Sequence, residues 1–141
     1  ALAPLHGKRL IGVHVRQTPF RGFENEPFLV PLSRARRIID EYLQEQKLDP
    51  KDVALVIISD KDVAPTAFDG FATCVRCGND VTSLFLLSKC SIVIGTNSTF
   101  SNLAAWFGNI PHVVIANEPI DWNYYREQPA YFQNKYATFA Q

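Results

Sequence analysis

The sequence predicts an α/β fold with a mostly parallel sheet. Short runs of apolar, β-branched residues alternate with segments that have helical periodicity or begin at helix-capping residues. The apolar runs are nearly continuous and lack the polar alternation of a strand with one face in water. Strands of this kind are buried on both faces, as in a parallel sheet covered by helices on both sides.

Five segments are predicted to be strands. The strongest signals are the run 10–15, Leu-Ile-Gly-Val-His-Val, and the run 53–59, which is apolar up to Ser59. The same criteria place the other three strands at 71–75, 91–95 and 111–116. Residues 62–68 are expected to form a loop or a short helical turn.

Three helices are predicted between these strands. The clearest is 33–46, because its apolar side chains share one face: Ile38, Ile39, Tyr42 and Leu43. Asp80 is a good N-cap for a second helix, which runs to about Lys89. Asn97 or Ser98 caps a third helix, which Gly108 is expected to end.

The order of these elements is strand, helix, strand, strand, helix, strand, helix, strand. We interpret it as a Rossmann-like three-layer sandwich. With 141 residues, the chain is expected to form a single domain, 1–141. It begins without Met and reaches a strand within ten residues, so we expect it to be a piece of a longer protein.

The composition argues against several classes of partner. Fourteen basic and fourteen acidic residues cancel, so the protein as a whole should not be drawn to nucleic acid or to an anionic membrane. No apolar run reaches the ~20 residues of a transmembrane helix. The three cysteines do not make a disulfide framework, which indicates a reducing compartment. Any bound anion must therefore be held by a few placed groups.

Polar residues follow several of the predicted strands. Open parallel sheets bind ligands at the carboxyl ends of their strands, so these positions form the candidate site. The candidates are Arg16 and Gln17 after the first strand, Ser59 and Asp60 at the end of the second, and Asn97, Ser98 and Thr99 after the fourth.

The segment from Gly95 to Ser101 is the most informative of these. Gly95 permits a tight turn, and the helix that follows begins with hydroxyl and amide side chains. The N-terminus of a helix has unpaired N–H groups and a partial positive charge, which attract phosphate. The alternative interpretation is that Asn97 or Ser98 only caps the helix, as such residues routinely do.

Arg16 leaves a buried strand at the same edge of the sheet. Its guanidinium can form paired, charge-assisted hydrogen bonds with a diphosphate. His14 lies two residues earlier, so its side chain points to the same face of the strand. The alternatives are an ordinary solvated charge for Arg16 and a satisfied core histidine for His14.

Asp60 is the third element of the candidate site. A carboxylate at a strand end can accept hydrogen bonds from a guanine edge or from ribose hydroxyls, although Asp60 could equally be a turn residue. The nearby Asp62 adds only a weak metal signal. Cys74 and Cys77 form a C-x-x-C pattern with no second pair, so we expect small buried side chains rather than a zinc or redox site.

Taken in order, these segments resemble the C-terminal part of the fucosyltransferase superfamily, most closely the α-1,2-fucosyltransferases. Those families have a strand ending in His-x-Arg-Arg, a strand ending in Ser-Asp, and a long final motif. Residues 11–16 match the first and residues 57–60 match the second. The final motif is matched by 80–90 and then by Asn-Ser-Thr-Phe-Ser at 97–101, and the likeness covers 10 to about 115.

The resemblance implies roles for the candidate residues. Arg16 would bind the donor diphosphate with support from His14, Asp60 would lie near the nucleoside, and Ser98, Thr99 and Phe100 would line the phosphate and base pocket. The donor in those families is GDP-L-fucose, and transfer inverts the anomeric carbon without a metal or another cofactor. The families place the glycan acceptor between two Rossmann-like domains, so this chain would be one of the two.

The chain also departs from the family pattern. Gln17 stands in place of the second arginine, and Asn102-Leu103 replaces a frequent Trp-Trp pair. We therefore expect a GDP-sugar donor, with GDP-L-fucose as the first candidate, and place Gln17 in the donor site. The general base is expected at Glu24 or Glu26, or in a missing N-terminal domain.

Two functional hypotheses follow. The first is the donor-binding domain of a glycosyltransferase for glycan or polysaccharide biosynthesis, in the cytoplasm of a bacterium or the Golgi lumen of a eukaryote. The second is a non-catalytic Rossmann-like module that binds a nucleotide or associates with another protein. The second relies on aromatic residues of the tail, which could instead form a helix that crosses to a partner domain: Trp122, Tyr124, Tyr125, Tyr131, Phe132, Tyr136 and Phe139.

Overall fold

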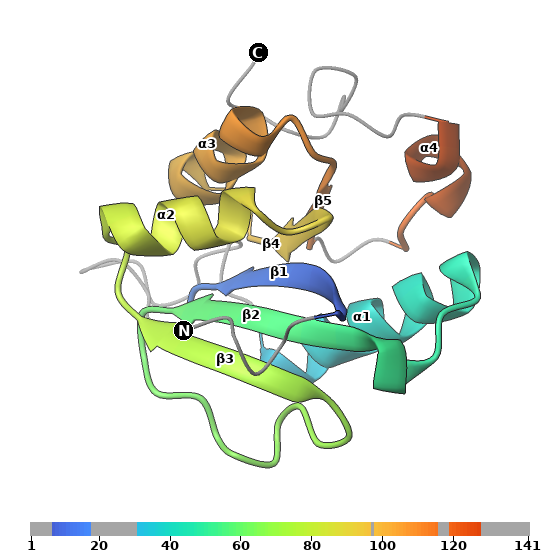
Figure 1. Cartoon of the computed structure of the whole chain (residues 1–141), viewed down its shortest axis with the longest axis horizontal. Coiled ribbons are helices and arrows are strands. Elements are labelled where there is room, and N and C mark those ends of the chain that lie inside the picture. Colours follow the sequence, from blue (N-terminus) through green and yellow to red (C-terminus); the bar gives the residue numbers. More distant parts are fainter. Residues whose placement is uncertain (1–6, 18–30, 97, 116–118, 128–141) are drawn as a thin grey trace.

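The computed structural model describes residues 7–17, 31–96, 98–115 and 119–127. They include a five-stranded, all-parallel sheet with the order β3-β2-β1-β4-β5 (Figure 1). The strands are β1 (Arg9–Val15), β2 (Val53–Ser59), β3 (Ala72–Cys77), β4 (Ile92–Gly95) and β5 (His112–Val114). This is the strand order of a Rossmann-like fold, so the predicted fold class is confirmed.

Helices cover both faces of this sheet. The helices are α1 (Leu32–Gln46), α2 (Val81–Ser88), α3 (Thr99–Gly108) and α4 (Trp122–Glu127), and a 3₁₀ turn, η2 (Pro50–Asp52), precedes β2. Figure 1 shows α2 and α3 side by side on one face, with α1 on the other. The side chains of α4 pack on the α1 face, where the rings of Trp122 and Tyr42 lie 6.0 Å apart.

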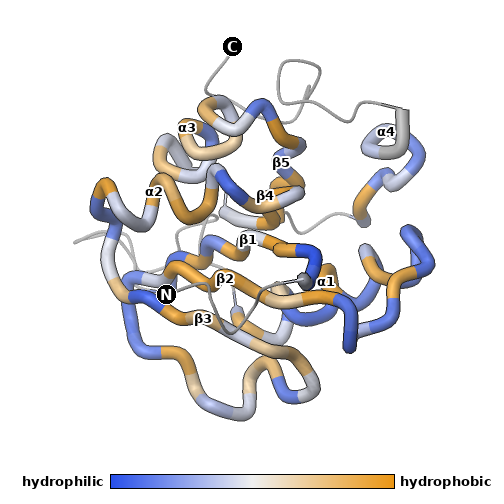
Figure 2. The backbone as a smooth tube through the Cα atoms, viewed as in Figure 1, coloured by the Kyte–Doolittle hydropathy of each residue, from blue (hydrophilic) through white to orange (hydrophobic). Residues whose placement is uncertain are grey.

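The face toward α1 holds an apolar core. Alternate residues of β1 point to it, namely Ile11, Val13 and Val15, and all three are buried. The predicted apolar face of α1 packs against them, while its other faces are polar, as the alternating colours of α1 in Figure 2 show. The 3.6-residue periodicity therefore identified the correct face of this helix.

The face toward α2 and α3 depends on close packing at two glycines. A Cβ atom added to Gly12 of β1 would lie 3.0 Å from Cδ2 of Leu87 in α2. One added to Gly108 would lie 2.3 Å from the backbone oxygen of Ser88. A backbone atom cannot rotate away as a side chain can, so α3 requires glycine where it passes the end of α2.

Several predicted boundaries are shifted, including that of β5, which runs over His112–Val114 instead of 111–116. Gly108 is the last residue of α3, and Asn109 ends the helix with a left-handed φ of 49°, which asparagine tolerates. β3 continues to Cys77 because it pairs with β2 as far as Ser59. Cys77 is exposed and Cys74 is half-buried, so the expectation of buried cysteines fails for Cys77. The reason is that β3 is an edge strand, which the helix layers cover only in part.

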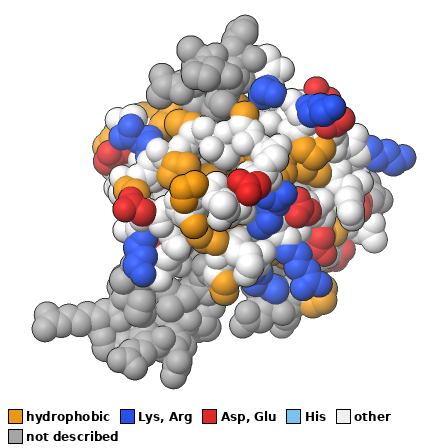
Figure 3. Space-filling model, turned by 90° about the horizontal axis from the view of Figure 1, so that it is seen from below, with side chains coloured by type: hydrophobic (Ala, Val, Ile, Leu, Met, Phe, Trp, Pro, Cys, Tyr) orange, Lys and Arg blue, Asp and Glu red, His pale blue; other side chains and the backbone are white. Residues whose placement is uncertain are grey.

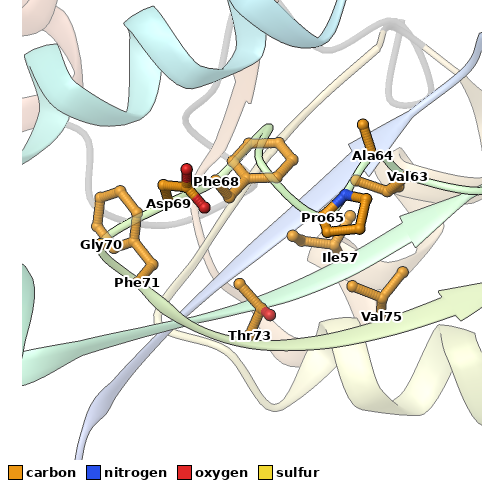
Figure 4. Close-up of a pocket in the computed structure, with 10 residues that line it drawn as sticks. All are labelled: Ile57, Val63, Ala64, Pro65, Phe68, Asp69, Gly70, Phe71, Thr73 and Val75. Atoms are coloured by element: carbon orange, nitrogen blue, oxygen red, sulfur yellow. The ribbon is translucent and has the colours of Figure 1, made fainter.

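Turns rather than a helix connect β2 to β3. A pocket of about 150 Å³ lies between this connection and the two strands, and Figure 4 labels the ten residues that line it. Figure 3 views the molecule from the β3 side and shows apolar side chains in small groups between basic and acidic ones. None of the predicted site residues lines this pocket.

Candidate functional site

The candidate site lies at the carboxyl ends of β1, β2 and β4. The strand order reverses between β1 and β4, because the connection after β1 leads to β2 on one side and the connection after β4 leads to β5 on the other. Ligands of doubly wound sheets bind outside the strand ends at such a switch point. The residues that follow β1 and β4 here are those that the sequence analysis singled out.

His14 is the central residue of this edge, and its ring is 3% exposed. Its Nε2 lies 3.3 Å from Oδ1 of Asn79, and its Nδ1 lies 3.4 Å from Oγ of Ser98 and 3.5 Å from Oγ1 of Thr96. Since Oδ1 can only accept, Nε2 carries the proton and Nδ1 accepts from a hydroxyl group. His14 therefore joins the segment before α2 to the segment before α3.

Burial lowers the pKa of His14 to about 4, although the hydrogen bond with Asn79 and the charge of Asp60 act in the opposite direction. At pH 7 the imidazole is neutral and supplies no positive charge for a phosphate. Its contribution to the site is to orient the hydroxyl groups around it. The structure thus gives His14 the features of a satisfied buried histidine whose partners belong to the candidate site.

Hydroxyl groups organise the N-terminus of α3. Ser98 is the N-cap, and its Oγ accepts the backbone N–H of Ser101 at 3.2 Å. Oγ of Ser101 donates to the carbonyl of Thr96 at 2.7 Å and also lies 2.7 Å from Oγ of Ser98. No acidic residue lies in the first turn of α3. The positive end of the helix dipole is therefore not neutralised by a carboxylate of that turn.

The ends of β1 and β2 are joined through Gln17. Its backbone N–H donates to Oδ1 of Asp60 at 2.8 Å, and its side-chain Nε2 donates to Oγ of Ser59 at 2.8 Å. A longer contact of 3.4 Å joins the same Nε2 to the carbonyl of Asp62. Arg16, directly before Gln17, is half-buried at the same edge. Gln17 was predicted to contact the ligand. In the structure its hydrogen bonds run to Ser59, Asp60 and Asp62.

The other predicted site residues divide into three groups. The Phe100 ring lies on His14, with a centroid separation of 5.1 Å. Thr99 is exposed at the first position of α3. Asn97, Glu24 and Glu26 lie outside the described residues.

The sequence analysis missed two polar contacts of this region. Asn79 meets His14 across 65 residues of chain, and no local pattern marks that contact. Oδ1 of Asn102 lies 2.8 Å from Nδ1 of His112 in a fully buried pair that ties α3 to β5. Burial, more than any other effect, lowers the pKa of His112 to about 3, so this histidine is neutral as well.

The N-terminus of α2 lies near the same edge but differs in charge. Oδ1 of its N-cap, Asp80, accepts the backbone N–H of Ser83 at 2.7 Å. Oδ2 of the same carboxylate lies 3.2 Å from Nη2 of Arg76. The hydrogen bonds from Ser83 and the contact with Arg76 lower the pKa of Asp80. This helix end already holds an anion, so a second one is disfavoured there.

The described residues contain no group of three or more His, Cys, Asp or Glu side chains arranged to hold a metal ion. Cys77 donates to Oδ1 of Asp62 at 3.4 Å, and this hydrogen bond raises the pKa of its thiol.

None of the helices in the described ranges is both long enough and apolar enough to cross a bilayer.

Comparisons with known proteins give one distant structural likeness. No protein-family model matches the sequence, and no curated protein matches it. A crystal structure from Listeria monocytogenes, described as a UDP-N-acetylglucosamine 2-epimerase, has a TM-score of 0.47 and 17% sequence identity to this chain. The similarity covers 79% of this chain but only 29% of that one. At this distance the likeness carries no inference about chemistry.

Proposed function

We propose that the chain is the donor-binding domain of an inverting, metal-independent glycosyltransferase that uses a GDP-sugar, with GDP-L-fucose as the first candidate. One observation carries the proposal. At the switch point of the sheet, Arg16 follows β1, and the N-terminus of α3, next to β1, has a neutral cap and no acidic residue in its first turn. A fixed positive charge and an unneutralised helix N-terminus at one edge suit a diphosphate.

The proposed chemistry needs charge stabilisation more than acid–base catalysis by this domain. When the sugar leaves GDP, negative charge builds up on the β-phosphate. Arg16 and the backbone N–H groups of α3 would stabilise that charge in place of a cation. Asp60 at the end of β2 would contact the nucleoside. The base that activates the acceptor hydroxyl would be Glu24 or Glu26, or a residue of an N-terminal domain.

Calorimetric titration of the chain with GDP, GDP-fucose, GDP-mannose and UDP tests this proposal. GDP compounds should bind. Arg16→Ala should lower their affinity by about 10- to 100-fold, because a charge-assisted pair contributes roughly 1.5–3 kcal/mol. Arg37→Ala is the matched control, since Arg37 is exposed on α1 across the sheet and should leave affinity unchanged. Equal affinities for wild type and Arg16→Ala would contradict the proposal.

A second candidate, a non-catalytic association module, has one observation in its favour. Phe85, Trp106 and Phe107 are 50%, 40% and 54% exposed on α2 and α3, and their rings are in contact. Of the tail aromatics on which this hypothesis first relied, Tyr125 is buried and Trp122 and Tyr124 pack partly buried on the α1 core, so these three do not support it. The others, Tyr131, Phe132, Tyr136 and Phe139, lie outside the described residues. A folded chain that ignores all four nucleotides but self-associates through Phe107 would favour this second function.

A further inference from the structure

We infer that Gln17 is a positioning residue, which holds Asp60 in register with Arg16 across the ends of two strands. The inference rests on the proposed function, in which Arg16 contacts the diphosphate and Asp60 contacts the nucleoside. Gln17 carries no charge and follows Arg16 directly, so it links the two contact points without supplying a counter-charge of its own.

The hydrogen bonds of Gln17 all run to the β2 end. Its backbone N–H holds one carboxylate oxygen of Asp60 at 2.8 Å and so restrains the orientation of that carboxylate. Its side-chain amide donates to Oγ of Ser59 at 2.8 Å. Oγ of Ser59 also accepts the backbone N–H of Lys61 at 3.2 Å, and Ser59 is fully buried. Gln17 thus holds both the carboxylate and the turn that carries it.

The side chain at position 17 must donate to perform this role. Both partners of Nε2 are oxygens, Oγ of Ser59 and, more distantly, the carbonyl of Asp62. A carboxylate at position 17 could not donate to that carbonyl and would add a negative charge beside Asp60. Holding both contact points before the ligand arrives reduces the ordering that binding must otherwise impose. This gain in affinity is expected only for ligands that contact both Arg16 and Asp60.

The comparison of a long and a short ligand tests this inference. GDP spans both contact points, whereas inorganic pyrophosphate reaches only Arg16 and the N-terminus of α3. Titration of Gln17→Leu should show GDP binding weakened about tenfold, which equals roughly 1.4 kcal/mol, with pyrophosphate binding within about twofold of wild type. Ser59→Ala, which removes the acceptor, should give the same pattern. Gln46→Leu, an exposed glutamine on α1, is the matched control.

Several outcomes would overturn the inference. Unchanged GDP affinity in Gln17→Leu would do so, and so would an equal loss for GDP and pyrophosphate, since a general structural defect weakens both. Amide hydrogen exchange on the unliganded chain supplies a readout that needs no ligand, because the backbone N–H of Gln17 should be protected in wild type and lose protection in Asp60→Ala. A wild-type chain with this protection that binds neither ligand would refute the proposed function, and with it the positioning role, while leaving the link between the strands intact.

Discussion

The helices α2 and α3 lie on the same face of the sheet, and both begin near its carboxyl edge, but their first residues differ in charge. α2 is capped by Asp80, which also contacts Arg76, whereas α3 is capped by the neutral Ser98. Both caps satisfy a backbone N–H three residues on, so they are equivalent as helix starts. Of these two helices, α3 alone begins without a carboxylate at its cap or in its first turn, which favours binding of an anion from outside. An equally good cap can therefore close one anion site and leave another open.

The largest effect is expected at His14, which contacts the segments before both helices. The pKa of His14 is about 4 in the folded chain, below the ordinary value of 6.5, because burial disfavours the charged ring. The unfolded chain therefore takes up a proton first as pH falls, and the stabilisation from the neutral ring is lost between pH 6.5 and 4. The total is on the order of 3 kcal/mol.

Urea denaturation of wild type and His14→Gln at several pH values from 7 to 4 checks this expectation. The free energy of unfolding of wild type should fall more steeply with acid than that of the variant. Burial lowers the pKa of His112 in both proteins, and His14 lowers it further in wild type, so the difference between the two curves reports the titration of His14 together with its coupling to His112. Parallel curves would show that His14 stays solvated, contrary to its burial.

The next largest effect is expected on GDP binding when the start of α3 is given a carboxylate, as the start of α2 already has in Asp80. Thr99→Asp places a carboxylate in the first turn of α3, and Thr82→Asp places one in the first turn of α2; both threonines are exposed. Thr99→Asp should weaken GDP by about 100-fold, because two like charges several ångströms apart repel by a few kcal/mol at an effective dielectric constant of about 20. Thr82→Asp should change the affinity by less than about threefold, since α2 is already capped by an anion.

Calorimetry on both variants measures the contrast, and thermal unfolding checks that each remains folded. An aspartate near a helix N-terminus should not destabilise either variant. Equal losses of GDP affinity in the two variants would remove the distinction between the helix ends and place the anion elsewhere.

The smallest expected effect is a difference in how the stability contributions of the two N-caps, Asp80 and Ser98, depend on pH. Asp80→Ala and Ser98→Ala should each lower Tm by a few degrees at pH 7, because each removes an N-cap. The folded-state pKa of Asp80 is lowered, so its contribution is present above the ordinary carboxyl pKa and disappears as pH falls through the folded value. The decrease in Tm caused by Asp80→Ala should therefore become smaller in acid. The decrease caused by Ser98→Ala should not, because Ser98 has no carboxylate to titrate.

Differential scanning calorimetry at pH 7 and pH 3 distinguishes the two variants. If the difference in Tm between wild type and Asp80→Ala were the same at both pH values, Asp80 would be acting as an uncharged cap. The argument that its charge closes the α2 end to anions would then fail.

The sequence by itself determined the fold class, most element positions and the edge that carries the candidate site. These depend on short-range patterns: the apolar runs at 10–15 and 53–59, the 3.6-residue periodicity of α1, and the capping residues Asp80 and Ser98. Each such pattern can be detected within a short stretch of sequence, because residue type and spacing mark which side chains must be buried and which residue caps a helix.

Only the tertiary structure decided which groups meet at that edge. Gln17 contacts Asp60 across 43 residues and His14 contacts Asn79 across 65, and neither spacing has a period that sequence analysis can detect. The end of β3 at Cys77 depends on pairing with β2, and the need for glycine at Gly108 depends on the approach of Ser88. Hydrogen bonds and close contacts of this kind depend on where the parallel strands and their helices come together, and that placement is a property of the folded chain as a whole.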